Sequence, residues 1–148
     1  MKTRFQNLGI IISILAVIAL AMGAAFIQQG FAKEAFLVKA MTQEQITVEG
    51  VEGIVDTAEE AQLAADTIRE HRHGIAPTYG DLLGGGRFNP TDPKQLSYGQ
   101  ALTLETYLYL AVASFGIFNV VKATGTFMLL TGVALGATGY GLISISRK

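Results

Sequence analysis

The sequence predicts an all-α membrane protein with a hydrophobic region at each end of the chain and a polar insert between them. Residues 8–27 are an uninterrupted apolar stretch without charge, and residues 104–145 contain only two charged side chains. Most of the remaining charge and all three prolines lie in residues 33–100. Apolar stretches of this length and purity are typical of segments that cross a bilayer.

The N-terminal element, residues 1–32, is expected to be a transmembrane helix. From Leu8 to Ile27 a helix rising about 1.5 Å per residue is about 30 Å long, which matches the hydrocarbon thickness. A cleaved secretory signal is the alternative, because Lys2 and Arg4 form a basic start and Gly30-Phe31-Ala32 resembles a cleavage site. The apolar stretch is longer than the core of a signal peptide, which favours a retained helix.

The C-terminal element, residues 101–148, is expected to be a transmembrane helical hairpin. Its apolar stretch is roughly twice as long as one crossing requires. Lys122 and Gly125 interrupt it, which predicts two helices at about residues 104–121 and 126–144. The alternative is a single tilted span over about residues 115–135 plus an amphipathic surface helix. The chain therefore has two or three spans, and the side of its C-terminus stays open.

The insert, residues 33–100, is acidic and is expected outside the cytoplasm. It contains six Lys or Arg and eleven Asp or Glu, a net charge of −5. Lys2 and Arg4 favour a cytoplasmic N-terminus in a multi-pass protein of the cell (inner or plasma) membrane. An acidic insert argues against nucleic acid as a partner, and the lack of cysteine excludes disulfides and thiolate metal sites.

Within the insert, one helix is predicted over residues 58–73. Thr57 and Glu60 have the spacing of a capping box, and Gly74 is a natural stop. Before this helix, residues 46–55 alternate apolar with polar residues but are interrupted by glycines, which suggests a short hairpin or an irregular extended stretch. After it, residues 74–97 form a loop rich in Gly and Pro, longer than a simple connector and therefore a candidate for function.

Small residues recur along the predicted spans and indicate close helix packing. Three glycines in the last span repeat every seven residues, and small residues of this kind let two backbones approach in a membrane. Either the protein's own helices or another membrane subunit, including a second copy, would fill these faces. The helix-packing candidates are Ala19, Gly23, Gly116, Gly125, Gly132, Gly136 and Gly139.

The insert contains one candidate metal cluster. Asp66, Glu70 and His73 are spaced to share a helical face, His71 lies between them, and His with carboxylates can hold Fe(II), Zn or Mn. The neighbouring Arg69 and Arg72 would repel a cation. A solvated helix end with bases suited to the helix dipole is therefore the preferred interpretation. No catalytic residue and no cofactor is expected.

Three stretches of the chain are similar to a family of small bacterial membrane proteins of uncharacterised function. They are residues 64–73 (AADTIREHRH), residues 76–88 (APTYGDLLGGGRF) and residues 107–111 (YLYLA). The resemblance covers roughly residues 40–145, and some members are labelled subunits of aromatic ring-opening dioxygenases. It implies a bacterial membrane protein and assigns no catalytic residue.

These features predict a noncatalytic accessory or scaffold subunit of a membrane complex, in contact with the lipid bilayer and with other subunits or itself. The alternative is a metal-dependent membrane enzyme, or a subunit of one, that uses His71 and His73. Transport of a small solute is a third class, but no Asp, Glu, Arg or His lies in the middle of a predicted span to form a path.

Overall fold

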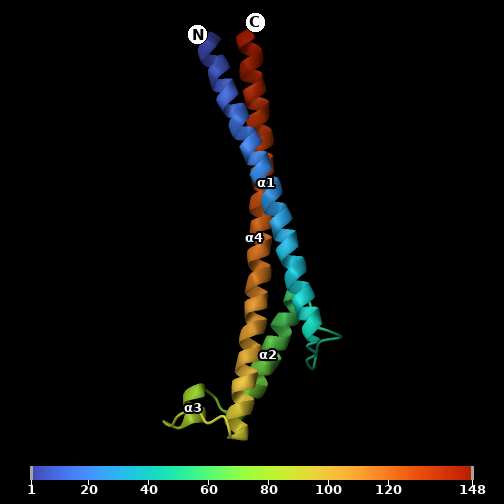
Figure 1. Ribbon diagram of the computed structural model, residues 1–148, viewed down its shortest axis with the longest axis vertical. Coiled ribbons are helices and arrows are strands. Elements are labelled where there is room, and N and C mark those ends of the chain that lie inside the picture. Colours follow the sequence, from blue (N-terminus) through green and yellow to red (C-terminus); the bar gives the residue numbers. More distant parts are fainter. Residues whose placement is uncertain (1, 148) are drawn as a thin grey trace. The chain divides into compact units, whose positions relative to one another are not determined.

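The computed structural model describes residues 2–147 and confirms the all-helical prediction. Helix accounts for 83% of the structure, and there is no strand in the described range. The helices are α1 (Lys2–Glu44), α2 (Ala58–Ile75), α3 (Tyr79–Leu83) and α4 (Pro93–Arg147), as Figure 1 shows. α1 and α4 are both long and apolar enough to cross a membrane.

The chain divides into two compact units. Unit 1 combines residues 1–33 with residues 117–148, and unit 2 is the continuous stretch from Glu34 to Gly116. Each unit therefore contains part of α1 and part of α4, whereas α2 and α3 belong to unit 2 alone. Residues 101–116, which the sequence groups with the C-terminal span, belong to unit 2.

The predicted break in the C-terminal region does not exist, so the expectation of a hairpin in residues 101–148 is wrong. α4 is one helix of 55 residues, and Val121, Lys122 and Gly125 all lie inside it. Neither Lys nor an isolated Gly must end a helix; glycine costs only about 1 kcal/mol relative to alanine.

In unit 1, the α1 and α4 segments run antiparallel with their backbones in close contact (Figure 1, blue and red). A Cβ atom on Gly9 would lie 2.9 Å from the carbonyl oxygen of Gly139. One on Gly23 would lie 2.7 Å from the carbonyl oxygen of Gly125. Real Cβ atoms do not approach this closely, so only glycine permits this packing at these positions.

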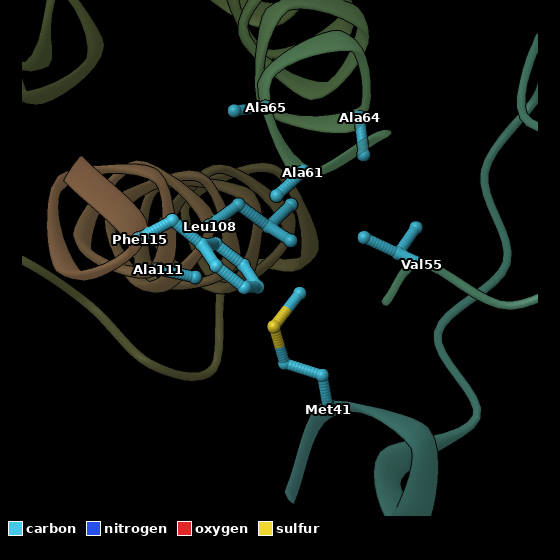
Figure 2. Packing of buried hydrophobic residues seen from close by; sticks show 8 residues of the cluster. All are labelled: Met41, Val55, Ala61, Ala64, Ala65, Leu108, Ala111 and Phe115. Atoms are coloured by element: carbon cyan, nitrogen blue, oxygen red, sulfur yellow. The ribbon is translucent and has the colours of Figure 1, made fainter. Parts of the chain in front are cut away.

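In unit 2, α2 begins with the capping box that the sequence predicts. The Thr57 hydroxyl accepts a hydrogen bond from the Glu60 amide at 3.2 Å, and the Glu60 carboxylate accepts one from the Thr57 amide at 3.1 Å. Alanines then face the interior of the unit. Figure 2 shows Ala61 of α2 beside Leu108 of α4, and Ala64 on the side of Val55. Ala65, Ala111, Phe115 and Met41 of α1 complete the cluster.

Residues 45–57 contain turns and irregular backbone without a strand. Gly50 and Gly53 adopt φ angles of +89° and +91°, which L side chains rarely adopt. The segment returns on itself through one backbone hydrogen bond, from the Val55 amide to the Ile46 carbonyl at 3.0 Å. This closure places the Val55 side chain, which has 0% exposure, in the interior of unit 2.

The loop predicted for residues 74–97 is shorter than expected at both ends. α2 continues through Gly74 to Ile75 and ends where Pro77 forces the preceding Ala76 into an extended conformation. α4 begins at Pro93, because proline fits the first turn of a helix and the Asp92 carboxylate accepts from the Lys94 amide at 2.8 Å. Between them α3 forms, capped by Thr78.

Candidate functional site

The seam between α1 and α4 in unit 1 is built from small residues spaced seven apart on both helices. Its α4 side consists of Gly125, Gly132 and Gly139, and each is buried. A Cβ on Gly132 would lie 3.1 Å from the Ala16 carbonyl oxygen. Each step of seven residues forward on α1 meets a step of seven backward on α4, as antiparallel helices require. We call this the glycine seam; its α1 residues are Gly9, Ala16, Gly23 and Gly30.

The predicted helix-packing residues differ in how closely they approach the facing helix. Among the predicted residues, Gly23 and the three α4 glycines of the seam form the tightest contacts. A Cβ on Gly136 would reach Ala16 at an ordinary 3.8 Å, one on Gly116 would meet nothing within 4 Å, and Ala19 is half-buried. Sequence reasoning missed Gly9, Ala16 and Gly30. Their seven-residue spacing, matching that of α4, is the signal that would have found them.

Lys122 lies at one end of the glycine seam. Its Nζ atom is 4.9 Å from the centre of the Phe31 ring, a cation–π contact. Its aliphatic chain crosses Gly30, where an added Cβ would lie only 2.6 Å from the Lys122 Cγ. The missing side chain at Gly30 thus makes room for a lysine within an apolar helix, and the methylene stem packs while the charge meets an aromatic face.

A buried polar cluster joins α2 to α4 in unit 2. Arg72 donates from Nε to the Glu105 carboxylate at 2.6 Å and from Nη2 to its other oxygen at 3.3 Å. Nη1 donates to the Tyr98 hydroxyl, and the guanidinium carbon lies 4.9 Å from the Tyr98 ring centre. Arg72 is 8% exposed, Glu105 7% and Tyr98 0%. A charge pair so removed from water needs this complete set of partners to be tolerated.

The polar cluster has a structural role. Hydrogen bonding to Glu105 raises the pKa of Arg72 above its usual value, so the guanidinium stays charged. No buried side-chain nitrogen or oxygen in residues 2–147 lacks a hydrogen-bond partner. The cluster therefore fixes α2 against α4. Glu105, the single acid in a long apolar stretch, signals the need for a buried cation, but the sequence does not tell which one.

Asp66 also faces α4. Tyr109 donates its hydroxyl hydrogen to the Asp66 carboxylate at 2.6 Å, Gln62 donates at 2.9 Å, and Arg69 forms a salt bridge at 2.8 Å. The Tyr109 hydrogen bond, with help from Gln62 and Arg69, lowers the pKa of Asp66. Both oxygens of this predicted metal candidate are therefore in use as hydrogen-bond acceptors.

The other metal candidates lie on the exposed side of α2. Glu70, His71 and His73 are all exposed, and the His73 Nε2 atom lies 3.3 Å from the Arg72 guanidinium. In residues 2–147 no three His, Cys, Asp or Glu side chains gather in a way that could hold a metal ion. The structure thus separates the four residues, two of them (Asp66 and His73) in contact with arginines.

An open groove of 560 Å³ lies between α1 and α4 within unit 2. Its walls are almost entirely apolar, and Glu44 is its only charged residue. A second hollow continues along α4 towards Phe88 and shares Leu104 and Tyr107 with the first. Tyr107 is 64% exposed and Leu110 60%, so large apolar side chains form an accessible rim.

Comparisons with protein-family models, with curated proteins and with solved structures give no match for the chain. What the site can do is therefore inferred from its residues and their geometry alone.

Proposed function

We propose that the chain is a noncatalytic accessory or scaffold subunit of a membrane complex, anchored by two antiparallel spans. The observation that carries this proposal is the use of the buried polar side chains in unit 2. Arg72, Glu105 and Tyr98 all act to hold one helix against another. Both buried charges of unit 2, Arg72 and Glu105, pair with each other, so neither is available for catalysis.

The membrane anchor is supported by the exposure of the apolar helices. In both α1 and α4, only 11% of the most apolar 18-residue window is buried. A core helix of a soluble protein would be mostly covered by the rest of the chain. Lipid is the surrounding that suits exposed side chains such as Val17, Leu130 and Val133, at 66%, 67% and 64% exposure.

The two-span topology is supported by the continuity of α4 and by the glycine seam. The seam extends from Gly9 to Gly30 in α1, and its contacts on α4 extend from Phe118 to Gly139. Each of these stretches is about 32 Å long, close to one bilayer thickness. Antiparallel packing over this length brings Lys2, Arg4 and Arg147 to the same end of unit 1. The positive-inside rule assigns that end to the cytoplasm, and the insert of residues 33–100 is then expected outside the cytoplasm.

Purification from native membranes in mild detergent tests the scaffold role. We expect one or more companion membrane proteins in a fixed ratio to the chain, measured by quantitative mass spectrometry. A chain that purifies as a lone monomer at native expression level would contradict the proposal.

Metal analysis separates the scaffold from the metal-dependent alternative. We expect no stoichiometric metal in the purified protein and no difference between wild type and a His71→Ala/His73→Ala variant. Stoichiometric Fe, Zn or Mn that disappears in this variant, while a Glu49→Gln control keeps it, would overturn the noncatalytic assignment.

A further inference from the structure

Continued into unit 2, the seven-residue spacing of the glycine seam reaches three large residues and one alanine. Continuing by sevens from Gly30 on α1 gives Leu37 and Glu44, and continuing from Gly125 on α4 past Phe118 gives Ala111 and Leu104. All four of these unit 2 residues line the 560 Å³ groove. Within unit 2, Leu37, Glu44 and Leu104 occupy three of these positions, and an open recess lies between α1 and α4.

The walls of this recess have the chemistry of a hydrocarbon site. Leu37, Ala40 and Met41 line it from α1, and Leu104, Leu108 and Ala111 line it from α4. The groove follows both helices, and from Leu104 to Ser114 its α4 wall is about 15 Å long. An apolar recess of this shape fits a single extended chain better than a folded protein surface.

The single charge in the groove indicates the headgroup. Glu44 is exposed at the end of α1 and forms no ion pair within residues 2–147. A carboxylate there attracts an ammonium group and repels a headgroup with net negative charge. The groove begins close to the proposed membrane span. Leu37, its first α1 residue, follows Ile27, the last residue of the apolar stretch, by only ten residues.

We propose that this groove binds one acyl chain of a membrane lipid with an ammonium-bearing headgroup, and that Glu44 contacts the ammonium. The inference rests on the proposed membrane anchor. It adds a lipid ligand to the scaffold and gives unit 2 a specific contact with the bilayer.

Photolabelling in vesicles tests the acyl-chain site. The full-length protein is reconstituted in phosphatidylcholine vesicles that contain a trace of phosphatidylethanolamine with a diazirine on its acyl chain. We expect labelled peptides from residues 37–46 and 104–114. Ala40→Phe and Ser114→Phe, which fill the groove from opposite walls, should each reduce this labelling about tenfold, a loss of about 1.4 kcal/mol in binding.

The matched control is Ala35→Phe, because Ala35 is exposed on the same helix and does not line the groove. It should label like wild type, and circular dichroism should show equal helix content in all variants. Equal labelling in Ala40→Phe, Ser114→Phe and Ala35→Phe would overturn the proposal. So would labelling confined to residues 8–27 and 125–143, or a groove crosslinked to a second copy or another protein instead of lipid.

A headgroup comparison tests Glu44. With a phosphatidylglycerol probe of the same acyl chain, wild type should label about fivefold less than with the ethanolamine probe. Glu44→Gln should abolish this preference, whereas Glu49→Gln, outside the groove, should keep it. A preference that survives in Glu44→Gln would overturn the role of this carboxylate. Vesicle flotation separates the two proposals: protein that does not float refutes the membrane anchor, and floating protein without groove labelling refutes only the lipid site.

Discussion

The buried ion pair between Arg72 and Glu105 is the residue-level feature with the largest expected energetic weight. Replacing Arg72 with Met leaves the Glu105 carboxylate 7% exposed and without its cation. Breaking a buried pair in this way costs about 3–5 kcal/mol. We expect Arg72→Met to lower the free energy of unfolding of unit 2 by about this amount, measured by chemical denaturation in detergent.

Arg69→Met is the matched control for Arg72→Met. Arg69 pairs with Asp66 at the surface, with side-chain exposures of 46% and 36%, and such pairs contribute less than about 1 kcal/mol. A second variant, Arg72→Met/Glu105→Leu, removes both charges and should recover much of the lost stability. Equal destabilisation by Arg72→Met and Arg69→Met would contradict the structural role of the buried pair.

Asp66 gives unit 2 an acid-sensitive contact between α2 and α4. Its folded pKa lies below the usual 3.8, so the ionised form stabilises the folded state above pH 3.8. That stabilisation is lost as the pH falls below 3.8 through the folded pKa. Tyr109→Phe removes the main cause of the shift, so the variant should lose less stability than wild type between pH 4 and about pH 2 in acid titrations followed by circular dichroism. An equal loss of stability at acid pH in wild type and Tyr109→Phe would contradict the role of the Tyr109 hydrogen bond.

At the residue scale, the sequence identifies unusual side chains but not their partners. Asp66 is recognisable as a polar residue on a helical face, yet the Tyr109 hydroxyl that binds it lies 43 residues away. Glu105 likewise pairs with Arg72 across 33 residues. Such contacts depend on how α2 packs on α4, and local pattern does not contain that information.

At the element scale, local rules predict α2 well and α4 poorly. The start of α2 is determined by Thr57 and Glu60, which lie three residues apart and interact directly. The continuity of α4 through Lys122 and Gly125 depends instead on α1, because Phe31 and Gly23 are their contacts. Without knowledge of these contacts, a lysine and a glycine in an apolar stretch look like a turn.

The glycine seam predicts opposite outcomes for two glycines of α4. A Cβ on Gly132 would lie 2.7 Å from the Leu20 Cγ and 3.1 Å from the Ala16 carbonyl oxygen, whereas one on Gly141 would meet nothing within 4 Å. Both substitutions by Leu gain the same helix propensity, so their difference isolates the seam. We expect Gly132→Leu to destabilise the packed pair by about 1–3 kcal/mol relative to Gly141→Leu, measured by thermal unfolding in detergent. Equal melting temperatures would mean that the seam does not hold the spans together.

At the scale of the whole molecule, composition is enough to predict the fold class. Long apolar stretches with little or no charge at both ends predict apolar helices, and the structure has them in α1 and α4. The number of crossings is not predictable from α4 alone, because its apolar stretch has the length of two spans. The missing information is the register with α1, which appears only when the seven-residue spacings of both helices are compared.

That register leads to a prediction about both ends of the chain. If α1 and α4 each cross once along the glycine seam, residues near Lys2 and Arg147 face the cytoplasm together, and the insert, which contains Thr91, faces outward. The chain contains no cysteine, so single cysteines at Thr3, Ser146 and Thr91 report the side of each site without interference. We expect an impermeant maleimide to label Thr91→Cys in intact cells, and Thr3→Cys and Ser146→Cys only after the membrane is opened. Labelling of Ser146→Cys in intact cells would place the C-terminus outside, as three spans require, and would contradict the antiparallel two-span anchor.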